Sequence, residues 1–372
     1  MKKIVISANT SWYLYNFRKN TILELIEQGY KVLAVAPLDE YSRCLKDLGC
    51  DYLNVDIDQS GTNPIKDVLT FISFYQIYKA FKPDVVLNFT PKNNIYSTLA
   101  AKLVGASIVN NIAGLGSLFI DGGIRSRIAR YLYKFSQSKA NKIFFQNGDD
   151  CKLFLEHNLA PHHLTAHLPG SGVDLQRFSC RKANDDGVIR FLLVARMLFD
   201  KGVGYYVDAA RILKAKYGDE LEFRLLGFLD VDNPSAISES QMQEWVEEGC
   251  VIYLGTSDTV EEEIAKVDCM VLPSFYREGV PKSLLEAGAM AKPIVTTDNV
   301  GCRETVDDGV NGFLCEPRST ISLVEKLEAI IQMTHSERLA MGECSRRKIK
   351  TEFDEKIVIQ RYIYTIAECL RA

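Results

Sequence analysis

Residues 269–290 read Cys269-Met-Val-Leu-Pro-Ser274-Phe-Tyr-Arg-Glu278-Gly-Val-Pro281-Lys-Ser-Leu-Leu-Glu286-Ala-Gly-Ala-Met290. The apolar run at 269–273 predicts a buried strand, and residues 281–291 show a short helical pattern. Pro281 suits the first turn of a helix because the N–H that it lacks would have no partner there. Gly279 lets a ligand approach the backbone just before the helix, where unpaired N–H groups and the helix dipole favour an anion. This segment therefore predicts a strand–loop–helix unit with an anion site.

Two carboxylates flank the predicted anion site. Glu278 lies in the loop before the helix, and Glu286 lies about one and a half turns into it. The arrangement suits a ligand with phosphate in the middle and hydroxyl-rich groups on either side, which is the form of a nucleotide-sugar. The spacing alone is equally compatible with two surface glutamates on an ordinary α/β unit.

Short apolar runs alternate with helical patterns along the rest of the chain, which predicts parallel sheets with crossover helices. Ligands of such sheets bind beyond the carboxyl ends of the strands. The loop after the first predicted strand lacks a Gly-x-Gly-x-x-Gly pattern, which argues against a dinucleotide site. In the first half we expect strands at 3–7, 31–36, 52–55, 84–88, 107–110 and 142–145, and helices at 17–28, 41–48, 63–81, 94–104, 125–140 and 149–157.

The composition predicts a soluble globular protein. The chain has 372 residues, of which 47% are hydrophobic and 25% charged, so it has room for two domains. Its start predicts a β-strand and no signal peptide, and no apolar run is long enough to span a bilayer. The ten cysteines form no Cys-x-x-Cys pair, which predicts free thiols in a reducing cytosol. We expect no metal, because the histidines at 162–167 have no other ligand at metal spacing.

The charge is distributed unevenly. Residues 1–180 contain 20 Lys and Arg against 15 Asp and Glu, giving +5, and residues 181–372 contain 24 against 33, giving −9. The acidic total of −4 argues against a nucleic-acid partner. Residues 124–142 combine six basic side chains with apolar ones at helical spacing and have no acidic residue. They predict either a peripheral membrane contact or an ordinary helix with a basic outer face.

Arg196 and Lys201 follow the first predicted strand of the second half, at 189–194, and lie five positions apart across a turn that enters a helix. Two cations in such a turn can converge on one diphosphate, where arginine supplies a planar fork and lysine a compact charge. Without further context, a surface arginine and a surface lysine explain them as well.

These segments, together with 298–317, resemble the retaining family 4 glycosyltransferases, whose signature Glu-x7-Glu matches Glu278 and Glu286 in spacing. The resemblance covers nearly the whole chain. It implies the α/β fold called GT-B: two Rossmann-like domains, here 1–180 and 181–352, facing each other across a cleft, with a C-terminal helix at 353–372 that returns to the first domain.

The resemblance also implies roles on the donor side, without a metal or cofactor. Arg196 and Lys201 would neutralise the departing diphosphate, Glu278 would contact the donor sugar, and Glu286 the ribose. The further donor-binding residues that it implies are Gly279, Val280, Gly227, Thr256 and Ser257.

On the acceptor side the resemblance points to loops of the first half, after the first, fourth and fifth predicted strands. Arg18 would pair with a phosphate or be solvated, and Lys92 would contact an acceptor pyrophosphate or be exposed. No histidine precedes His157, so the acceptor base stays unassigned. The candidate acceptor residues are Asn9, Trp12, Tyr15, Arg18, Lys92, Gly116 and Ser117.

The strings 9–18, 114–119 and 232–235 are similar to those of bacterial enzymes that extend sugars linked to undecaprenyl diphosphate. The expected activity is transfer of a sugar, with N-acetylhexosamine as first choice, from a UDP-sugar to such an acceptor in surface-glycan assembly. The expected location is the inner face of the plasma membrane. A UDP-sugar epimerase of similar fold and a non-catalytic nucleotide-sugar-binding protein remain as alternatives.

Overall fold

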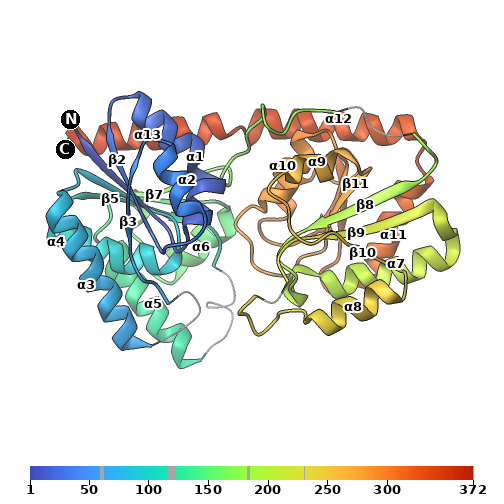
Figure 1. The fold of residues 1–372 in the computed structure, drawn as a ribbon, viewed down its shortest axis with the longest axis horizontal. Coiled ribbons are helices and arrows are strands. Elements are labelled where there is room, and N and C mark those ends of the chain that lie inside the picture. Colours follow the sequence, from blue (N-terminus) through green and yellow to red (C-terminus); the bar gives the residue numbers. More distant parts are fainter. Residues whose placement is uncertain (59–62, 116–122, 182–184, 230, 372) are drawn as a thin grey trace. The chain divides into compact units, whose positions relative to one another are not determined.

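The computed structural model describes residues 1–58, 63–115, 123–181, 185–229 and 231–371. The chain divides into two compact units (Figure 1). Unit 1 comprises Met1–Ser171 and Lys356–Ala372, and unit 2 comprises Gly172–Glu355. The described part of the chain contains no helix with the length and apolar character that crossing a membrane requires.

Unit 1 is built on a seven-stranded parallel sheet with the order β3-β2-β1-β4-β5-β6-β7. The order reverses at β1, so the sheet is doubly wound, with helices on both faces. Its strands are β1 (Lys3–Ser7), β2 (Lys31–Ala36), β3 (Asp51–Asn54), β4 (Val85–Asn88), β5 (Ser107–Ile112), β6 (Lys142–Phe145) and β7 (Thr165–His167). Its helices are α1 (Ser11–Glu27), α2 (Tyr41–Asp47), α3 (Pro64–Phe81), the π-helical η1 (Asn93–Ser97), α4 (Thr98–Leu103), α5 (Ile124–Gln137), α6 (Gly148–Glu156), the short 3-10 helix η3 (His162–Leu164) and α13 (Glu355–Arg371).

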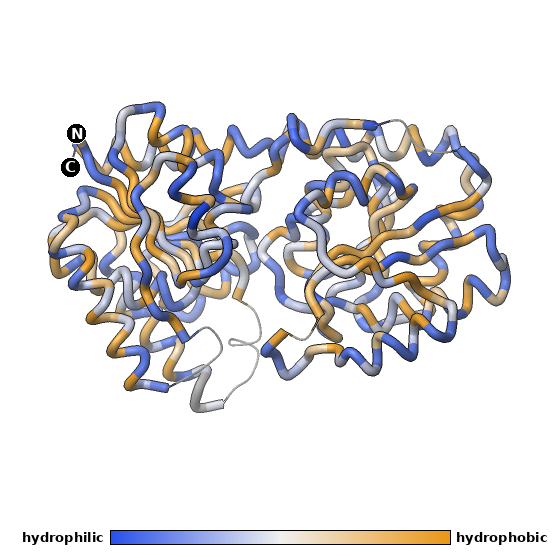
Figure 2. The backbone as a smooth tube through the Cα atoms, viewed as in Figure 1, coloured by the Kyte–Doolittle hydropathy of each residue, from blue (hydrophilic) through white to orange (hydrophobic). Residues whose placement is uncertain are grey.

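Alternate residues of these strands enter two separate cores, because successive strand side chains point to opposite faces. Val5 and Val86 pack with α3, α4, α5 and α6 on one face. Ile4 and Val85 pack with α1, α2 and α13 on the other. The contribution of α13 comes from Val358, Tyr362 and Ile366, so the end of the chain is part of unit 1. Figure 2 shows the hydrophobic residues concentrated along the strands.

Unit 2 repeats this architecture with a six-stranded parallel sheet of order β10-β9-β8-β11-β12-β13. Its strands are β8 (Ile189–Val194), β9 (Leu221–Leu226), β10 (Ile252–Tyr253), β11 (Cys269–Leu272), β12 (Ile294–Thr297) and β13 (Gly312–Cys315). Its helices are α7 (Val203–Tyr217), α8 (Glu239–Glu247), α9 (Val260–Ala265), α10 (Lys282–Ala289), α11 (Thr320–Gln332) and α12 (His335–Glu352), with short 3-10 helices η4 (Phe199–Lys201), η5 (Gly218–Glu220) and η6 (Arg303–Thr305).

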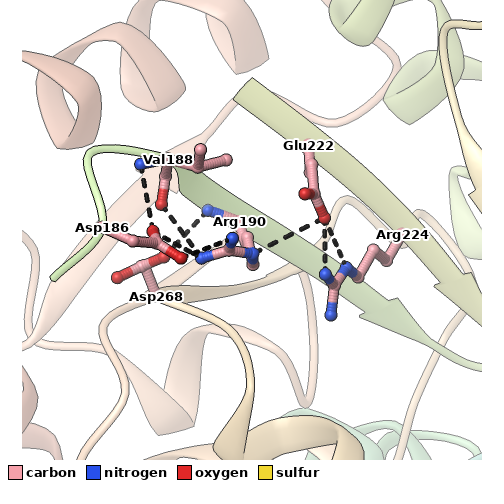
Figure 3. Close-up of polar contacts among 6 residues, drawn as sticks. All are labelled: Asp186, Val188, Arg190, Glu222, Arg224 and Asp268. Atoms are coloured by element: carbon pink, nitrogen blue, oxygen red, sulfur yellow. Dashed lines mark hydrogen bonds and ion pairs between the residues drawn. The ribbon is translucent and has the colours of Figure 1, made fainter. Parts of the chain in front are cut away.

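A group of charged side chains holds the amino ends of β8 and β9 (Figure 3). The Arg190 guanidinium donates to both carboxylate oxygens of Asp186, at 2.9 and 2.8 Å, and lies 3.6 Å from Glu222 of the neighbouring strand. The Arg190 backbone N–H donates to the Asp268 carboxylate at 2.9 Å. The hydrogen bond from Arg190 lowers the pKa of Asp186 to about 2. These charges therefore stabilise the sheet at the edge opposite the carboxyl ends of its strands.

Three differences from the predicted elements have local causes. The first helix begins at Ser11, because the side chain of Thr10 caps it by accepting the Tyr13 N–H at 2.9 Å. The helix predicted at 94–104 starts as a π-helix over Asn93–Ser97, a form that hydrophobic periodicity does not distinguish. The strand Thr165–His167 was not predicted, since three half-buried or exposed residues at a sheet edge show no apolar run.

Candidate functional site

The turn after β8 is locked against the loop after β11. Gly202 adopts a φ of 78°, and a Cβ at this position would collide with the carbonyl of Pro273. The backbone N–H groups of Phe275 and Tyr276 both donate to the carbonyl of Asp200 at 3.0 Å. Glycine is required where a left-handed conformation and a close backbone approach coincide. The two predicted phosphate-side segments, 195–202 and 274–281, are therefore held together.

Lys201 and Glu278 meet between these segments. The Lys201 ammonium forms an ion pair with one carboxylate oxygen of Glu278, and the Ser274 hydroxyl donates to the same oxygen at 2.9 Å. The ammonium also lies 5.0 Å from the centroid of the Tyr276 ring. Both charged side chains are largely removed from solvent, with 13% and 10% exposed. Two of the three predicted catalytic residues thus form one partly buried pair.

Arg196, the third predicted catalytic residue, is exposed in the same turn. Burial raises the pKa of Tyr276, the charges of Glu278 and Asp200 raise it further, and the charge of Arg196 opposes them. Because coulombic effects of this kind fall off with distance, Arg196 lies within electrostatic range of Tyr276, whose ring also contacts the Lys201 ammonium.

Gly279 and Val280 connect this pair to α10. Gly301, in the loop after β12, has a φ of 82°, and a Cβ there would collide with the carbonyl of Gly279. The loop after β12 therefore supports the backbone just before the helix. Val280 is buried, and α10 begins at Lys282 directly after Pro281, close to the predicted start.

Glu286 lies half-buried in α10. Desolvation raises the pKa of its carboxyl to about 7, while Lys282 and Arg177 lower it and Glu261 raises it. The Arg177 guanidinium donates to Glu261 at 2.8 and 3.1 Å and to the carbonyl of Asp258 at 2.8 Å. Glu286 is thus within electrostatic range of Arg177, which binds the turn directly after Thr256 and Ser257.

Gly227, Thr256 and Ser257 follow β9 and β10. Gly227 has a φ of 145°, and a Cβ there would collide with the carbonyl of Ala195. Its N–H donates to the carbonyl of Gly255 at 2.8 Å. Thr256 is exposed and Ser257 half-buried. Because β10, β9, β8 and β11 are consecutive in the sheet, the predicted donor residues of unit 2 all lie at or after the carboxyl edge of four adjacent strands.

Asn9, Trp12 and Tyr15, on the acceptor side, are half-buried. Trp12 and Tyr15 lie in the first turns of α1, so the prediction that they belong to a loop was wrong. Their rings contact aromatic neighbours, with centroids 5.5 Å apart for Trp12 and Phe17.

Arg18 is inside unit 1, with 1% of its surface exposed. Its guanidinium lies 4.3 Å from the ring centroid of Phe89 and 5.8 Å from that of Tyr362, and it donates to the Tyr13 hydroxyl at 3.2 Å. The expectation of a solvated arginine was wrong, and this enclosure also separates the charge from any ligand in solution. The available signal was the spacing of four and seven positions to Ile22 and Leu25, which puts Arg18 on the buried face of the helix.

Lys92 pairs with Asp67 of α3 at 2.6 Å, and the Tyr96 hydroxyl donates to the other carboxylate oxygen at 2.8 Å. The lysine is neither fully exposed nor in a loop, since it lies in the helical turn that enters η1. Gly116 and Ser117 lie outside the residues that the structure describes.

The carboxyl edge of the unit 1 sheet holds a network of uncharged side chains that the sequence prediction missed. The side-chain oxygen of Asn88 accepts hydrogen bonds from Ser7 at 2.7 Å and Ser97 at 2.6 Å. The Asn88 amide donates to Asn110 at 2.9 Å, which in turn donates to Gln137 of α5 at 2.8 Å. All five are fully buried. Polar residues at the ends of two predicted neighbouring strands, Asn88 and Asn110, were the available signal.

No group of three or more His, Cys, Asp or Glu residues with the spacing of a metal site occurs within the described part of the chain. On the donor side, the structure brings the side chains of Lys201, Glu278 and Ser274 into contact.

Comparisons with known proteins match both units. Residues 189–333 match the family model for group 1 glycosyl transferases, and residues 3–147 match that for glycosyl transferase 4-like domains. The structure superimposes on a glycosyltransferase from Rickettsia africae with a TM-score of 0.78, covering 99% of this chain and 98% of the other at 16% identity. It superimposes on Anabaena Alr3699/HepE, solved in complex with UDP-glucose, with a TM-score of 0.79 over the full length of both chains at 16% identity. These likenesses define the fold as that of a two-domain GT-B glycosyltransferase.

Two curated relatives extend the match in sequence. An N,N'-diacetylbacillosaminyl-diphospho-undecaprenol alpha-1,3-N-acetylgalactosaminyltransferase of Campylobacter jejuni is 29% identical over 94% of each chain. A UDP-Gal:alpha-D-GlcNAc-diphosphoundecaprenol alpha-1,3-galactosyltransferase of Escherichia coli is 24% identical over 78% of each. The chain thus carries a glycosyl transferase 4-like domain and a group 1 glycosyl transferase domain, and it is a transferase.

Proposed function

We propose that this glycosyltransferase moves an N-acetylhexosamine from a UDP-sugar to a saccharide linked to undecaprenyl diphosphate, with retention and without a metal. The observation that carries the proposal is the partly buried meeting of Lys201 and Glu278 beside the start of α10. It supplies a cation for a departing phosphate next to a carboxylate for sugar hydroxyls.

Lys201 and Arg196 stabilise the negative charge that grows on the β-phosphate as the sugar departs, and the amides of Gly279 and Val280 add hydrogen bonds. Charged donors that are already in place act most strongly where solvent is excluded. Lys201 fits this requirement because its side chain is only 13% exposed. On donor binding, the diphosphate takes the position beside Lys201, and Glu278 turns to the hydroxyls of the sugar.

The nucleoside lies along α10 and the turns after β9 and β10. Glu286 accepts hydrogen bonds from the ribose hydroxyls, and the backbone around Gly227, Thr256 and Ser257 holds the base. Support for this arrangement comes from the sheet order, in which β9 and β10 are adjacent and only β8 separates β9 from β11, the strand before α10.

In the transfer step, the bond between sugar C1 and the phosphate oxygen breaks while C1 bonds to the acceptor hydroxyl oxygen on the same face. The departing phosphate oxygen keeps the electron pair and takes the acceptor proton, and UDP leaves. This route needs no separate base, in agreement with the absence of histidine before His157.

The acceptor is inferred from the names of the two curated relatives, both of which act on sugars linked to diphospho-undecaprenol. Unit 1 would present this acceptor, with a peripheral membrane contact through residues 124–142 at the inner face of the plasma membrane. Support comes from α5, which exposes Arg127, Ile128, Tyr131 and Lys134 on its surface.

The test is incubation of the purified protein with candidate UDP-sugars, with and without a lipid-diphosphate-linked saccharide. We expect UDP release and an extended saccharide only when the acceptor is present, with the α-anomeric configuration of the donor kept in the product. Epimerised donor would identify a UDP-sugar epimerase instead. Binding of the donor without turnover would identify a non-catalytic nucleotide-sugar-binding protein.

A further inference from the structure

The N-terminal half of α3 exposes a stripe of aliphatic side chains. Ile65, Val68, Leu69 and Ile72 are 72%, 56%, 57% and 40% exposed. Their spacing of three, four and seven positions places them on one face of the helix. The opposite face of α3 is already buried in the unit 1 core through residues such as Phe74. The exposed stripe is therefore additional to the face that the fold requires, and contiguous apolar surface of this kind marks an interaction site.

Helix α5 exposes a second apolar stripe. Ile128, Tyr131 and Phe135 are 54%, 70% and 50% exposed and recur at spacings of three and seven positions. The C-terminal part of the stripe borders a groove of about 460 Å³, whose lining includes Tyr131, Phe135, Lys134 and Pro161.

The two helices cover the same face of the sheet. Both contribute to one core cluster, and both contact η1 (Figure 1). Each follows a parallel strand, α3 after β3 and α5 after β5, so their N-terminal ends lie at the carboxyl edge of the sheet. This is the edge that carries Asn88, Asn110 and the turn with Lys92.

The charge around the α5 stripe is positive, whereas charged residues beside the α3 stripe form pairs, among them Lys66 with Asp58. In α5, Arg127, Arg130 and Lys134 have no acidic neighbour in the same helix, and the Lys139 ammonium lies 5.3 Å from the ring centroid of Phe135. In α3, the carboxylate of Asp67 is neutralised by Lys92. Apolar side chains in a basic surround complement an anionic lipid leaflet. A second copy of the chain would instead oppose basic surfaces to each other.

We infer that α3 and α5 form one docking surface for an anionic membrane leaflet, in which the aliphatic side chains of α3 insert beside the headgroups. The inference rests on the proposed lipid-linked acceptor, and it adds α3 to the contact expected from residues 124–142. Docking through the N-terminal ends of both helices brings the carboxyl edge of the unit 1 sheet close to the plane where a lipid diphosphate lies.

The test compares the wild-type chain with the double variant Val68→Ser/Leu69→Ser in sedimentation with vesicles. The vesicles are phosphatidylcholine alone or phosphatidylcholine with phosphatidylglycerol. We expect the wild type to bind the anionic vesicles, and the variant to lose roughly tenfold or more in vesicle affinity, because it removes two inserting aliphatic side chains. The matched control is Ile321→Ser on α11 of unit 2, which is 73% exposed and should bind like the wild type.

Vesicle binding by the double variant at wild-type strength would overturn the inference, as would a wild type that ignores anionic vesicles. A wild type that is dimeric and a double variant that is monomeric would also overturn it, because the surface would then bind a second copy of the chain. Circular dichroism and UDP-release turnover with a short-chain, detergent-soluble acceptor report folding and catalysis separately. The variant should keep both, which would assign its loss to docking. A wild type that binds anionic vesicles but transfers no sugar contradicts the proposed function and leaves the docking surface supported.

Discussion

The two units use the carboxyl edges of their parallel sheets differently. In unit 2 this edge is charged, with Lys201 and Glu278 in contact and Arg196 within electrostatic range of the neighbouring Tyr276. In unit 1 the same edge holds the neutral network of Asn88 and Asn110. Two cations of unit 1 interact inside the unit: Arg18 contacts aromatic rings, and Lys92 forms an ion pair with Asp67. One architecture therefore carries a partly buried ion pair at this edge in unit 2 and a buried network of uncharged side chains at this edge in unit 1.

The proposed function assigns the departing charge to unit 2. The most direct test of this assignment is the substitution Lys201→Ala, which removes the partly buried cation. We expect kcat for UDP release to fall by about 10²–10³, which corresponds to roughly 3–4 kcal/mol of barrier. Lys266→Ala, at an exposed lysine paired with Glu263, is the control and should leave kcat unchanged. Wild-type kcat in Lys201→Ala would contradict the assignment.

The charged edge also depends on the close approach of two turns, which Gly202→Ala tests. The added Cβ combines a left-handed conformation with a collision against the Pro273 carbonyl. We expect the free energy of unfolding to fall by about 2 kcal/mol or more beyond the control. The control is Gly249→Ala, directly after the C-cap of α8, where φ is 73° and no atom lies within 4 Å of the added Cβ, so that only conformational strain of about 1–2 kcal/mol remains. Denaturant unfolding measures both variants. Equal losses of unfolding free energy would show that the close contact between the two turns does not contribute to stability.

The pH dependence of UDP binding tests the proposed role of Glu286. With the pKa of its carboxyl raised to about 7, the group is ionised above this pH and progressively protonated below it. Because the ionised form accepts ribose hydrogen bonds best, affinity should be highest above about pH 7 and should fall by at most about tenfold per pH unit below it.

Calorimetric titration of UDP across this range measures the effect. Glu286→Gln is the control, because it keeps the side-chain size and leaves only the pH dependence of UDP itself. Identical pH profiles for the wild type and Glu286→Gln would rule out a contribution from this carboxyl.

The smallest effect is expected for Lys92→Ala in unit 1. Loss of the half-buried pair with Asp67 should lower the free energy of unfolding by about 1 kcal/mol and leave UDP affinity unchanged. The control is Lys31→Ala, whose pair with Asp51 is more exposed and should contribute less. A raised acceptor KM in Lys92→Ala alone would show that the lysine also contacts the acceptor, in which case the two edges differ less in charge than the structure indicates.

The donor side was more accessible to sequence analysis than the acceptor side. Residues such as Pro281, Glu278 and Glu286 follow local rules for strand ends and helix starts, and α10 begins within a residue of its predicted position. The acceptor side depends on where α1 begins. Thr10 caps that helix earlier than the apolar pattern predicts, and this shift moves Trp12 and Tyr15 into a helix. The burial of Arg18 depends instead on the side chains that pack against the helix face that it shares with Ile22 and Leu25.

The amino-acid sequence by itself determined the α/β class and the two parallel sheets, because periodicity and turn chemistry act over a few neighbouring positions. The list of donor-side residues came from the resemblance to a known family and stays a prediction. Only the tertiary structure decided which charges meet. Lys201 and Glu278 are separated by 77 positions, and their contact exists because β8 and β11 are adjacent in the sheet. Likewise, only the folded unit shows that Arg18 is enclosed and that the stripe on α3 is exposed, since burial depends on what the rest of the chain packs against each face.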